Sequence, residues 1–69
     1  MKISTAKELG VQIKKRREKL QYTQSYVSEY TGLSISFISE VENGKETAQI
    51  GKVMQLIEIL GMDLEIKER

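Results

Sequence analysis

The stretch that decides the fold is residues 23–44, which read TQSYVSEYTGLSISFISEVENG. It contains two short helical patterns separated by a turn at Gly32. Thr23 predicts the start of the first helix, because a threonine oxygen can accept a free backbone N–H there. Gly32 predicts the end of that helix at Thr31, since glycine adopts the left-handed conformation that a helix end commonly needs. Two separate helices are therefore expected.

The second helix is predicted from Ser34 to the pair Asn43-Gly44. Helical spacing puts Ile38 and Val41 on one side of it. The other side carries Ser34, Ile35, Ser36, Ser39 and Glu40. Two helices joined by a short glycine turn are typical of the helix-turn-helix, whose second helix lies in the major groove of DNA. The alternative is an ordinary helical hairpin whose glycine only makes a turn.

This segment resembles the helix-turn-helix of the phage-repressor-like (Xre/Cro-type) DNA-binding proteins. The resemblance rests on Thr23-Gln24, Ser28, Gly32, Ile38 and the exit Glu42-Asn43-Gly44-Lys45. Ser28 is expected where the two helices approach most closely, a position at which the family usually has alanine. The resemblance implies a mainly α, lambda-repressor-like DNA-binding domain of four to five helices.

The composition excludes several kinds of catalytic and metal site. The 69-residue chain has no cysteine and no histidine, which removes disulfides, thiol nucleophiles, histidine bases and the usual zinc ligands. Its five glycines form no phosphate-binding loop, and its serines have no neighbouring base. We therefore expect one small domain without a metal, a cofactor or enzymatic activity.

Charge is distributed unevenly along the chain. The net charge is only +1, but residues 1–45 carry eight Lys or Arg against five Asp or Glu, whereas residues 46–69 carry three against five. The apolar runs are too short to span a bilayer, and the N-terminus has no apolar signal-peptide core. We expect a cytoplasmic protein that does not interact with a membrane.

A first helix is predicted from the capping box Thr5-Ala6-Lys7-Glu8 to about Leu20. Ala6, Leu9, Ile13 and Arg17 share one side of it, and Gly10 lies close to that side, where another helix could cross closely. The family resemblance implies a partly buried ion pair between Arg17 and Glu42. The last turns carry Lys14, Lys15, Arg16, Arg17 and Lys19. These cations either compensate the helix dipole or contact phosphates.

A fourth helix is predicted from a cap at Thr47 to Leu60, with Gly61 after its end. Its main apolar stripe is expected to contain Ile50, Val53, Met54, Ile57 and Leu60. Leu56 falls at the margin of this stripe, and Ile59 lies opposite it. These two side chains add more apolar surface than a monomer of this size needs, which predicts a partner.

The tail Met62-Asp63-Leu64-Glu65-Ile66-Lys67 alternates apolar and charged residues, which predicts a half-buried strand. No second strand is predicted, so the simplest pairing is with the same strand of a second copy. We therefore divide the chain into a helix-turn-helix domain (1–61) and a dimerisation strand (62–69). The expected dimer contacts are Leu56, Ile59, Met62, Leu64 and Ile66. The alternative is a frayed tail.

A narrower resemblance covers residues 45–56 and the strand-like ending, which are similar to those of the HipB-like antitoxins. This resemblance implies a homodimeric repressor that binds a palindromic operator in double-stranded DNA and neutralises a HipA-like kinase toxin. The alternatives are a phage-type repressor, a restriction-modification controller, or a protein-interaction module of the same fold.

Correspondence with the family also assigns the DNA contacts. The residues expected to face base edges are Ser34, Ile35, Ser36, Ser39 and Glu40. The expected phosphate contacts are Thr23, Gln24, Asn43, Lys45 and Arg16. None of the base-facing residues can read guanine as arginine does, so each half-site should discriminate bases only modestly. Phe37 could pack in the core or reach toward a sugar or base, and we favour packing that supports the helix.

Overall fold

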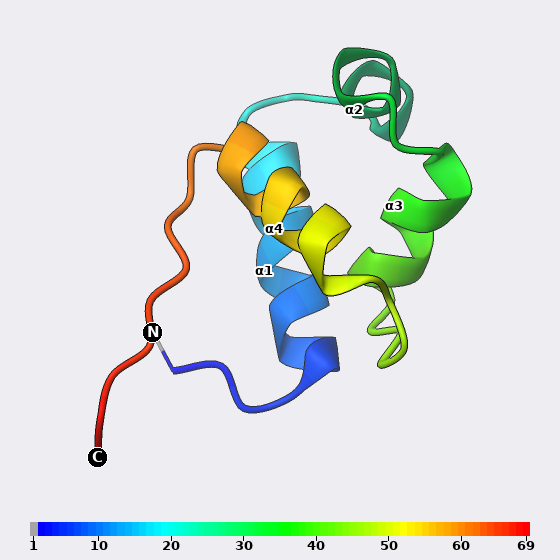
Figure 1. The fold of residues 1–69 in the computed structure, drawn as a ribbon. Helices are drawn as coiled ribbons and strands as arrows, with labels where there is room; N and C mark the ends of the chain where they lie inside the picture. The colour runs from blue at the N-terminus through cyan, green and yellow to red at the C-terminus, as the bar shows by residue number, and fades with distance from the viewer. Residues whose placement is uncertain (1) are drawn as a thin grey trace.

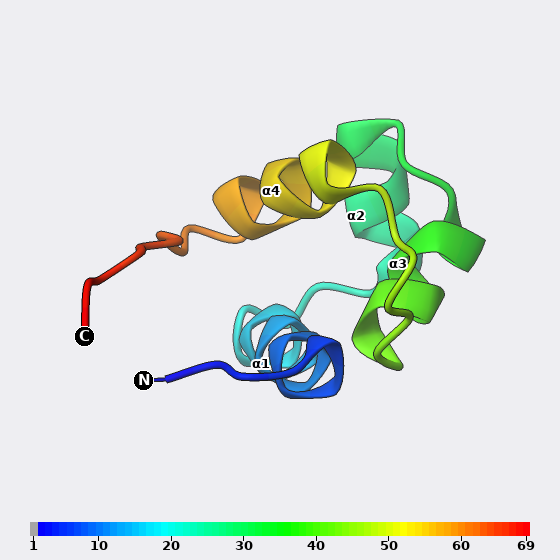
Figure 2. The ribbon, with the colours of Figure 1, turned by 60° about the horizontal axis from the view of Figure 1, so that its bottom comes forward.

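Four α-helices form the fold of residues 2–69, the part of the chain that this computed structural model describes. They are α1 (Ala6–Lys19), α2 (Gln24–Thr31), α3 (Ile35–Glu42) and α4 (Ile50–Ile59). Figure 1 shows the helices in chain order, and Figure 2 shows α1 and α4 on opposite sides of the domain with α2 and α3 at one end. The helix-turn-helix is therefore made by α2 and α3. None of the described helices is long and apolar enough to cross a bilayer.

Local hydrogen bonds fix the starts of three helices. The side-chain oxygens of Thr5, Thr23 and Ser34 each accept the backbone N–H three residues on, at 3.0 Å. A cap of this kind stabilises a helix by about 1 kcal/mol. The Glu8 carboxylate reaches back to the N–H of Ser4 at 3.0 Å rather than to that of Thr5. These helix starts lie where the sequence predicts them.

The turn between α2 and α3 is closed by Gly32 and Ser28. Gly32 has a φ of +79° and donates its N–H to Ser28 O at 2.9 Å. The Ser28 hydroxyl donates to Leu33 O at 2.6 Å. Serine in place of the family's usual alanine therefore satisfies a carbonyl at the point where the chain changes direction.

One apolar core lies between the four helices. Its buried members are Ile13, Val27, Leu33, Ile38, Val41, Val53, Leu56, Ile57 and Leu60. Phe37 and Tyr22 are half-buried and pack against this core. Every buried side-chain nitrogen or oxygen of residues 2–69 has a hydrogen-bond partner. The recognition helix α3 thus rests on a core to which all four helices contribute.

Gly10 lets α1 and α3 approach closely. A Cβ atom at this position would lie 2.3 Å from Val41 O and 2.7 Å from Glu42 O, which are backbone atoms. No side chain of α1 can therefore occupy this point without moving α3. The crossing holds the last turn of α3 directly against α1.

The predicted start of α4 is wrong, and its predicted apolar stripe is right in part. The helix begins at Ile50 after Gln49, which makes no side-chain cap, instead of after Thr47. Val53, Ile57 and Leu60 are buried as predicted, whereas Met54 and Ile50 are exposed. Leu56 is fully buried, so it provides no surface for a dimer. The buried stripe is therefore rotated toward Leu56 by about half a residue step from the predicted one.

The tail from Asp63 to Arg69 forms no regular secondary structure in this single chain. Figure 2 shows it leading away from the helices after α4. Met62 packs against the core, Leu64 is half exposed, and Ile66 is 98% exposed. The tail therefore makes almost no contact with its own domain.

Candidate nucleic-acid interface

The outer face of α3 is open to solvent. Ser34, Ile35, Ser36 and Glu40 are exposed, and Ser39 is half-buried. The inner face is buried through Ile38, Val41 and Glu42. None of the protein's own helices covers the serine-rich face, so it is available to a groove of DNA.

Three of the expected base-facing side chains already have partners within the protein, and the weakest is the Ser39 hydroxyl, which accepts from Asn43 Nδ2 at 3.4 Å. The Ser34 oxygen accepts the N–H of Phe37, which leaves its own O–H free to donate. The Glu40 carboxylate accepts a hydrogen bond from Lys45 Nζ at 2.8 Å, and both side chains are about half exposed. An exposed pair of this kind contributes at most about 1 kcal/mol, so DNA can displace it.

A buried ion pair joins α3 to α1, as the resemblance implied. Arg17 donates from Nε to Glu42 Oε2 at 2.6 Å and from Nη2 to Glu42 Oε1 at 3.0 Å. Its Nη1 donates to Tyr22 O at 2.8 Å. The hydrogen bond to Glu42 raises the pKa of Arg17 above its ordinary value, so the guanidinium is charged at every physiological pH. The two-point geometry fixes the orientation of Glu42 as well as its distance.

Gln24 belongs to the same network. Its Nε2 donates to Glu42 Oε1 at 3.0 Å, so the amide group points toward the ion pair. Because the first N–H groups of any helix lack partners within it, the backbone at the start of α2 can still bind a phosphate. Gln24 therefore positions the start of α2 against α3, in addition to its expected contact with DNA.

The other expected phosphate contacts lie at different places on the domain. Thr23 caps α2, and Asn43 donates from Nδ2 to Ser39 O at 2.8 Å, so both lie at helix ends beside α3. Arg16 is elsewhere. Its Nε donates to Leu60 O at 2.8 Å, at the C-terminal end of α4. Arg16 thus caps α4 through its Nε, and because its side chain is only half-buried, the expected phosphate contact stays a prediction.

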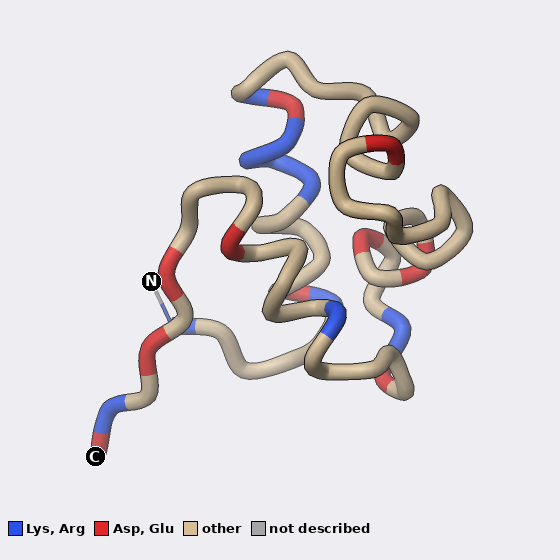
Figure 3. The backbone as a smooth tube through the Cα atoms, turned by 45° about the horizontal axis from the view of Figure 1, so that its top comes forward, with Lys and Arg blue, Asp and Glu red and all other residues tan. Residues whose placement is uncertain are grey.

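A basic surface on α1 contains Lys14 and Lys15, for which phosphate contact was one of the two predicted roles, and adds Lys7, which was not among the predicted contacts. Figure 3 shows several Lys and Arg residues close together along α1. A groove of about 470 Å³ lies between α1 and the end of α3 and is lined by Lys7, Val11, Lys14, Lys15, Glu18, Glu42 and Asn43. Lys7 packs against Gly44, immediately after α3. Its seven-residue spacing from Lys14 was visible in the sequence, but its contact with residue 44 was not.

The four-helix arrangement and the open face of α3 define a helix-turn-helix DNA-binding domain. Residues 13–67 match the family described as Helix-turn-helix, and the chain belongs to this family. It is also 34% identical, over 65 residues, to the HTH-type transcriptional regulator y4mF of Sinorhizobium fredii (strain NBRC 101917 / NGR234), covering 94% of this chain and 86% of that protein. The chain is thus a helix-turn-helix transcriptional regulator, a class that is not enzymatic.

Solved structures of HipB complexes have a similar fold. The chain in the HipB-O4 20mer complex gives a TM-score of 0.90 at 20% identity and covers 99% of this chain and 96% of that one. The HipA-HipB-O2-O3 complex gives the same TM-score, identity and coverage. These findings confirm the phage-repressor-like resemblance and the mainly α, four-helix fold.

Proposed function

We propose that this protein is a dimeric repressor that binds a palindromic operator and acts as the antitoxin of a HipA-like kinase toxin in the cytoplasm. The observation that carries the DNA-binding part is the uncovered outer face of α3, which is held on α1 by the Arg17–Glu42 pair. A base-reading face must keep a fixed position relative to the groove, and a buried two-point ion pair supplies that rigidity.

Ser36 and Ile35 are the residues we assign to the centre of base recognition. Both are exposed on the first turn of α3, which begins at Ile35. A serine hydroxyl can donate to or accept from a base edge, and an isoleucine side chain can pack on a thymine methyl group. Ser34, Ser39 and Glu40 complete the face, with Glu40 suited to accept from the amino group of cytosine.

Phosphates on either side of the groove would be held by helix ends and by cations. The start of α2 at Thr23 and Gln24 offers backbone N–H groups, and Asn43 and Lys45 lie just beyond α3. We add Lys7, which packs beside Gly44 at the same end of α3. Backbone contacts of this kind set the register of the protein on the duplex without reading its sequence.

Dimerisation through residues 62–69 would place two helix-turn-helix units on one operator and so add to the modest base recognition of each unit. The tail has an alternating pattern and a backbone without regular hydrogen bonds in the single chain, and pairing with the same segment of a second copy would satisfy both. Ile59, Met62, Leu64 and Ile66 are the apolar residues available for this contact. Two helix-turn-helix units would then read half-sites about one helical turn apart.

The antitoxin role is supported by the fold that this chain shares with HipB in a complex with HipA and DNA. A phage-type repressor, a restriction-modification controller and an interaction module of the same fold are the competing functions. Co-expression with the product of the neighbouring gene separates them. Restored growth and a co-purified kinase would support the antitoxin, whereas a neighbouring methyltransferase or phage gene would overturn it.

The DNA-binding role is tested with duplexes from the region upstream of the gene. The double variant Ile35→Ala, Ser36→Ala should bind upstream and random duplexes with nearly equal affinity, because the base contacts are gone. A matched control, Ile50→Ala with Ser4→Ala, removes the same side chains from exposed positions outside α3 and should keep the preference. Binding that does not weaken as salt rises would contradict DNA recognition and favour the interaction module.

A further inference from the structure

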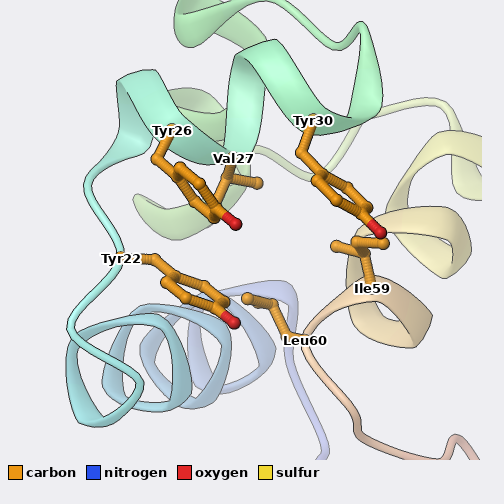
Figure 4. Close-up of a pocket in the computed structure, with 6 residues that line it drawn as sticks. All are labelled: Tyr22, Tyr26, Val27, Tyr30, Ile59 and Leu60. Atoms are coloured by element: carbon orange, nitrogen blue, oxygen red, sulfur yellow. The ribbon is translucent and has the colours of Figure 1, made fainter.

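An apolar groove lies between α2 and the end of α4, away from the outer face of α3. It measures about 180 Å³ and is lined by Tyr22, Tyr26, Val27, Tyr30, Ile59 and Leu60. Figure 4 shows Tyr26 and Tyr30 on α2, with Tyr22 and Leu60 side by side across from Tyr26 and with Ile59 next to Tyr30. A cavity of about 150 Å³ can hold a benzene-sized group, so this groove is large enough for a branched aliphatic side chain.

The groove exposes apolar surface to water, which is energetically unfavourable. The ring centroids of Tyr22 and Tyr26 are 4.8 Å apart, and those of Tyr26 and Tyr30 are 6.3 Å apart, so the rings form one continuous wall. Tyr30 is 67% exposed, and Ile59 is 37% exposed. Aromatic rings with a polar tip and adjoining aliphatic side chains are typical of surfaces that bind another protein segment.

The tail has the complementary properties. It leaves the domain after Met62, two residues beyond Leu60, which lines the groove, and Figure 1 shows it running away from α2. Leu64 and Ile66 are two residues apart, so in an extended chain their side chains point to the same side. Ile66 is 98% exposed. The same molecule therefore carries an empty apolar groove and an uncovered apolar segment that does not reach it.

Charge favours the same pairing. Residues 63–66 of the tail contain Asp63 and Glu65 and no cation, whereas Lys67 and Arg69 lie beyond Ile66. Tyr22, at one end of the groove, follows the basic end of α1, where Lys19 is exposed and Arg16 lies beside Gly61. An acidic strand laid along this end of the domain would therefore meet cations at its polar edge.

We propose that the groove of each protomer binds Leu64 and Ile66 of a second copy, with the acidic residues of that tail facing the end of α1. This inference rests on the dimer proposed above and names its contact. Because the tail leaves its own domain beside one groove and would enter the other, the exchange is reciprocal, as a two-fold dimer requires.

Disulfide trapping tests the contact directly, because the chain has no cysteine of its own. A tagged Ile59→Cys protein is mixed with an untagged Leu64→Cys protein and oxidised, so that a bond between residues 59 and 64 can form only between chains. The control mixes Ile50→Cys, an exposed α4 residue outside the groove, with the same Leu64→Cys protein. We expect the mixed disulfide to form at least tenfold faster with Ile59→Cys than with Ile50→Cys.

Sedimentation of the wild type separates failure of this contact from failure of the dimer. A dimeric wild type with equal trapping rates at positions 59 and 50 would overturn the groove contact and leave the dimer standing. A monomeric wild type at all concentrations would overturn both.

Tyrosine fluorescence gives a second readout, because the protein has three tyrosines, all in the groove, and no tryptophan. Acrylamide quenching should fall as the wild type dimerises. The variant Ile66→Asp should raise the dimer dissociation constant roughly a hundredfold and leave the rings accessible. Ile50→Asp is the matched control and should change the constant by less than about threefold. Quenching that does not change on dimerisation would contradict the proposal.

Discussion

The contact between α1 and α3 differs in kind from the groove between α2 and α4. At the first, Gly10 removes a side chain, and the buried Arg17 and Glu42 side chains satisfy each other. At the second, Tyr30 and Ile59 are exposed, and the tail passes by without filling the space. One contact is complete within a single chain, whereas the other presents a surface that a single chain does not use.

This difference separates two requirements on the same small domain. The recognition helix must be rigid in every copy of the protein, so its attachment is built from residues of one chain. The proposed dimer would depend on protein concentration, so its contacts would be exposed in the single chain. The predictions below test whether each contact behaves in this way.

The largest effect is expected at the buried ion pair. Glu42→Ala leaves the Arg17 guanidinium buried without its carboxylate and should lower the free energy of unfolding by about 3–5 kcal/mol. A domain of this size has only about 3–10 kcal/mol in total. Urea unfolding at low temperature measures the change, and Glu40→Ala, at an exposed pair, should cost at most about 1 kcal/mol.

The pH dependence of that effect follows from the raised pKa of Arg17. A raised pKa gives stability that is present below the ordinary pKa of arginine and lost only as the pH rises through the higher value in the folded protein. The cost of Glu42→Ala should therefore be the same at pH 6 and pH 9. A cost that disappears at pH 9 would mean that the ion pair does not hold α3.

The second effect concerns the close crossing at Gly10. Gly10→Ala puts a Cβ atom where Val41 O lies 2.3 Å away and should lower the free energy of unfolding by about 2–3 kcal/mol. Gly51, which lies in α4, is the matched control, because a Cβ atom at this position would meet nothing within 4 Å. Gly51→Ala should raise stability by about 0.5–1 kcal/mol. Equal effects in thermal melts would show that α1 and α3 are not tightly packed.

A smaller effect is expected where Arg16 caps α4. Arg16→Met keeps the aliphatic stem but removes the bond to Leu60 O, and should cost about 1–2 kcal/mol. Lys19→Met, an exposed residue of the same helix, should stay within about 0.5 kcal/mol. If both variants unfold at the same urea concentration, the bond from Arg16 to Leu60 O contributes nothing to the free energy of unfolding.

The smallest effect is expected in the tail. Ile66→Ser should leave the unfolding free energy of the monomer within about 0.5 kcal/mol of the wild type, because the side chain touches almost nothing in its own domain. Urea unfolding at concentrations below the dimer dissociation constant measures this. A larger loss of unfolding free energy would show that the tail already packs on its own domain. The α2–α4 groove would then no longer differ from the α1–α3 contact.

The helix-turn-helix was predictable from sequence because its signals are local. Thr23, Gly32 and Ser34 act on the backbone within a few residues, so their effect does not depend on the rest of the fold. The Arg17–Glu42 pair came from family resemblance, since no local rule joins residues 25 positions apart. The outer face of α3 followed from helical spacing once the helix ends were known.

The errors arose where tertiary packing decides. Apolar residues cover much of α4, and only its neighbours determine that Leu56 faces inward and Met54 outward. The bond from Arg16 to Leu60 O was missed, because its acceptor is 44 positions away in the sequence. The tail pattern predicts a strand, but a strand needs a partner that one chain does not contain.

The exposed pair between Lys45 and Glu40 has a consequence for how anchoring and reading depend on each other. Lys45 cannot neutralise a phosphate fully while its ammonium group is bonded to Glu40 at 2.8 Å. In the proposed complex, a phosphate that draws Lys45 away would also free the Glu40 carboxylate to accept a hydrogen bond from the amino group of a cytosine. The ammonium group of Lys45 would thereby link phosphate binding to base recognition by its neighbour.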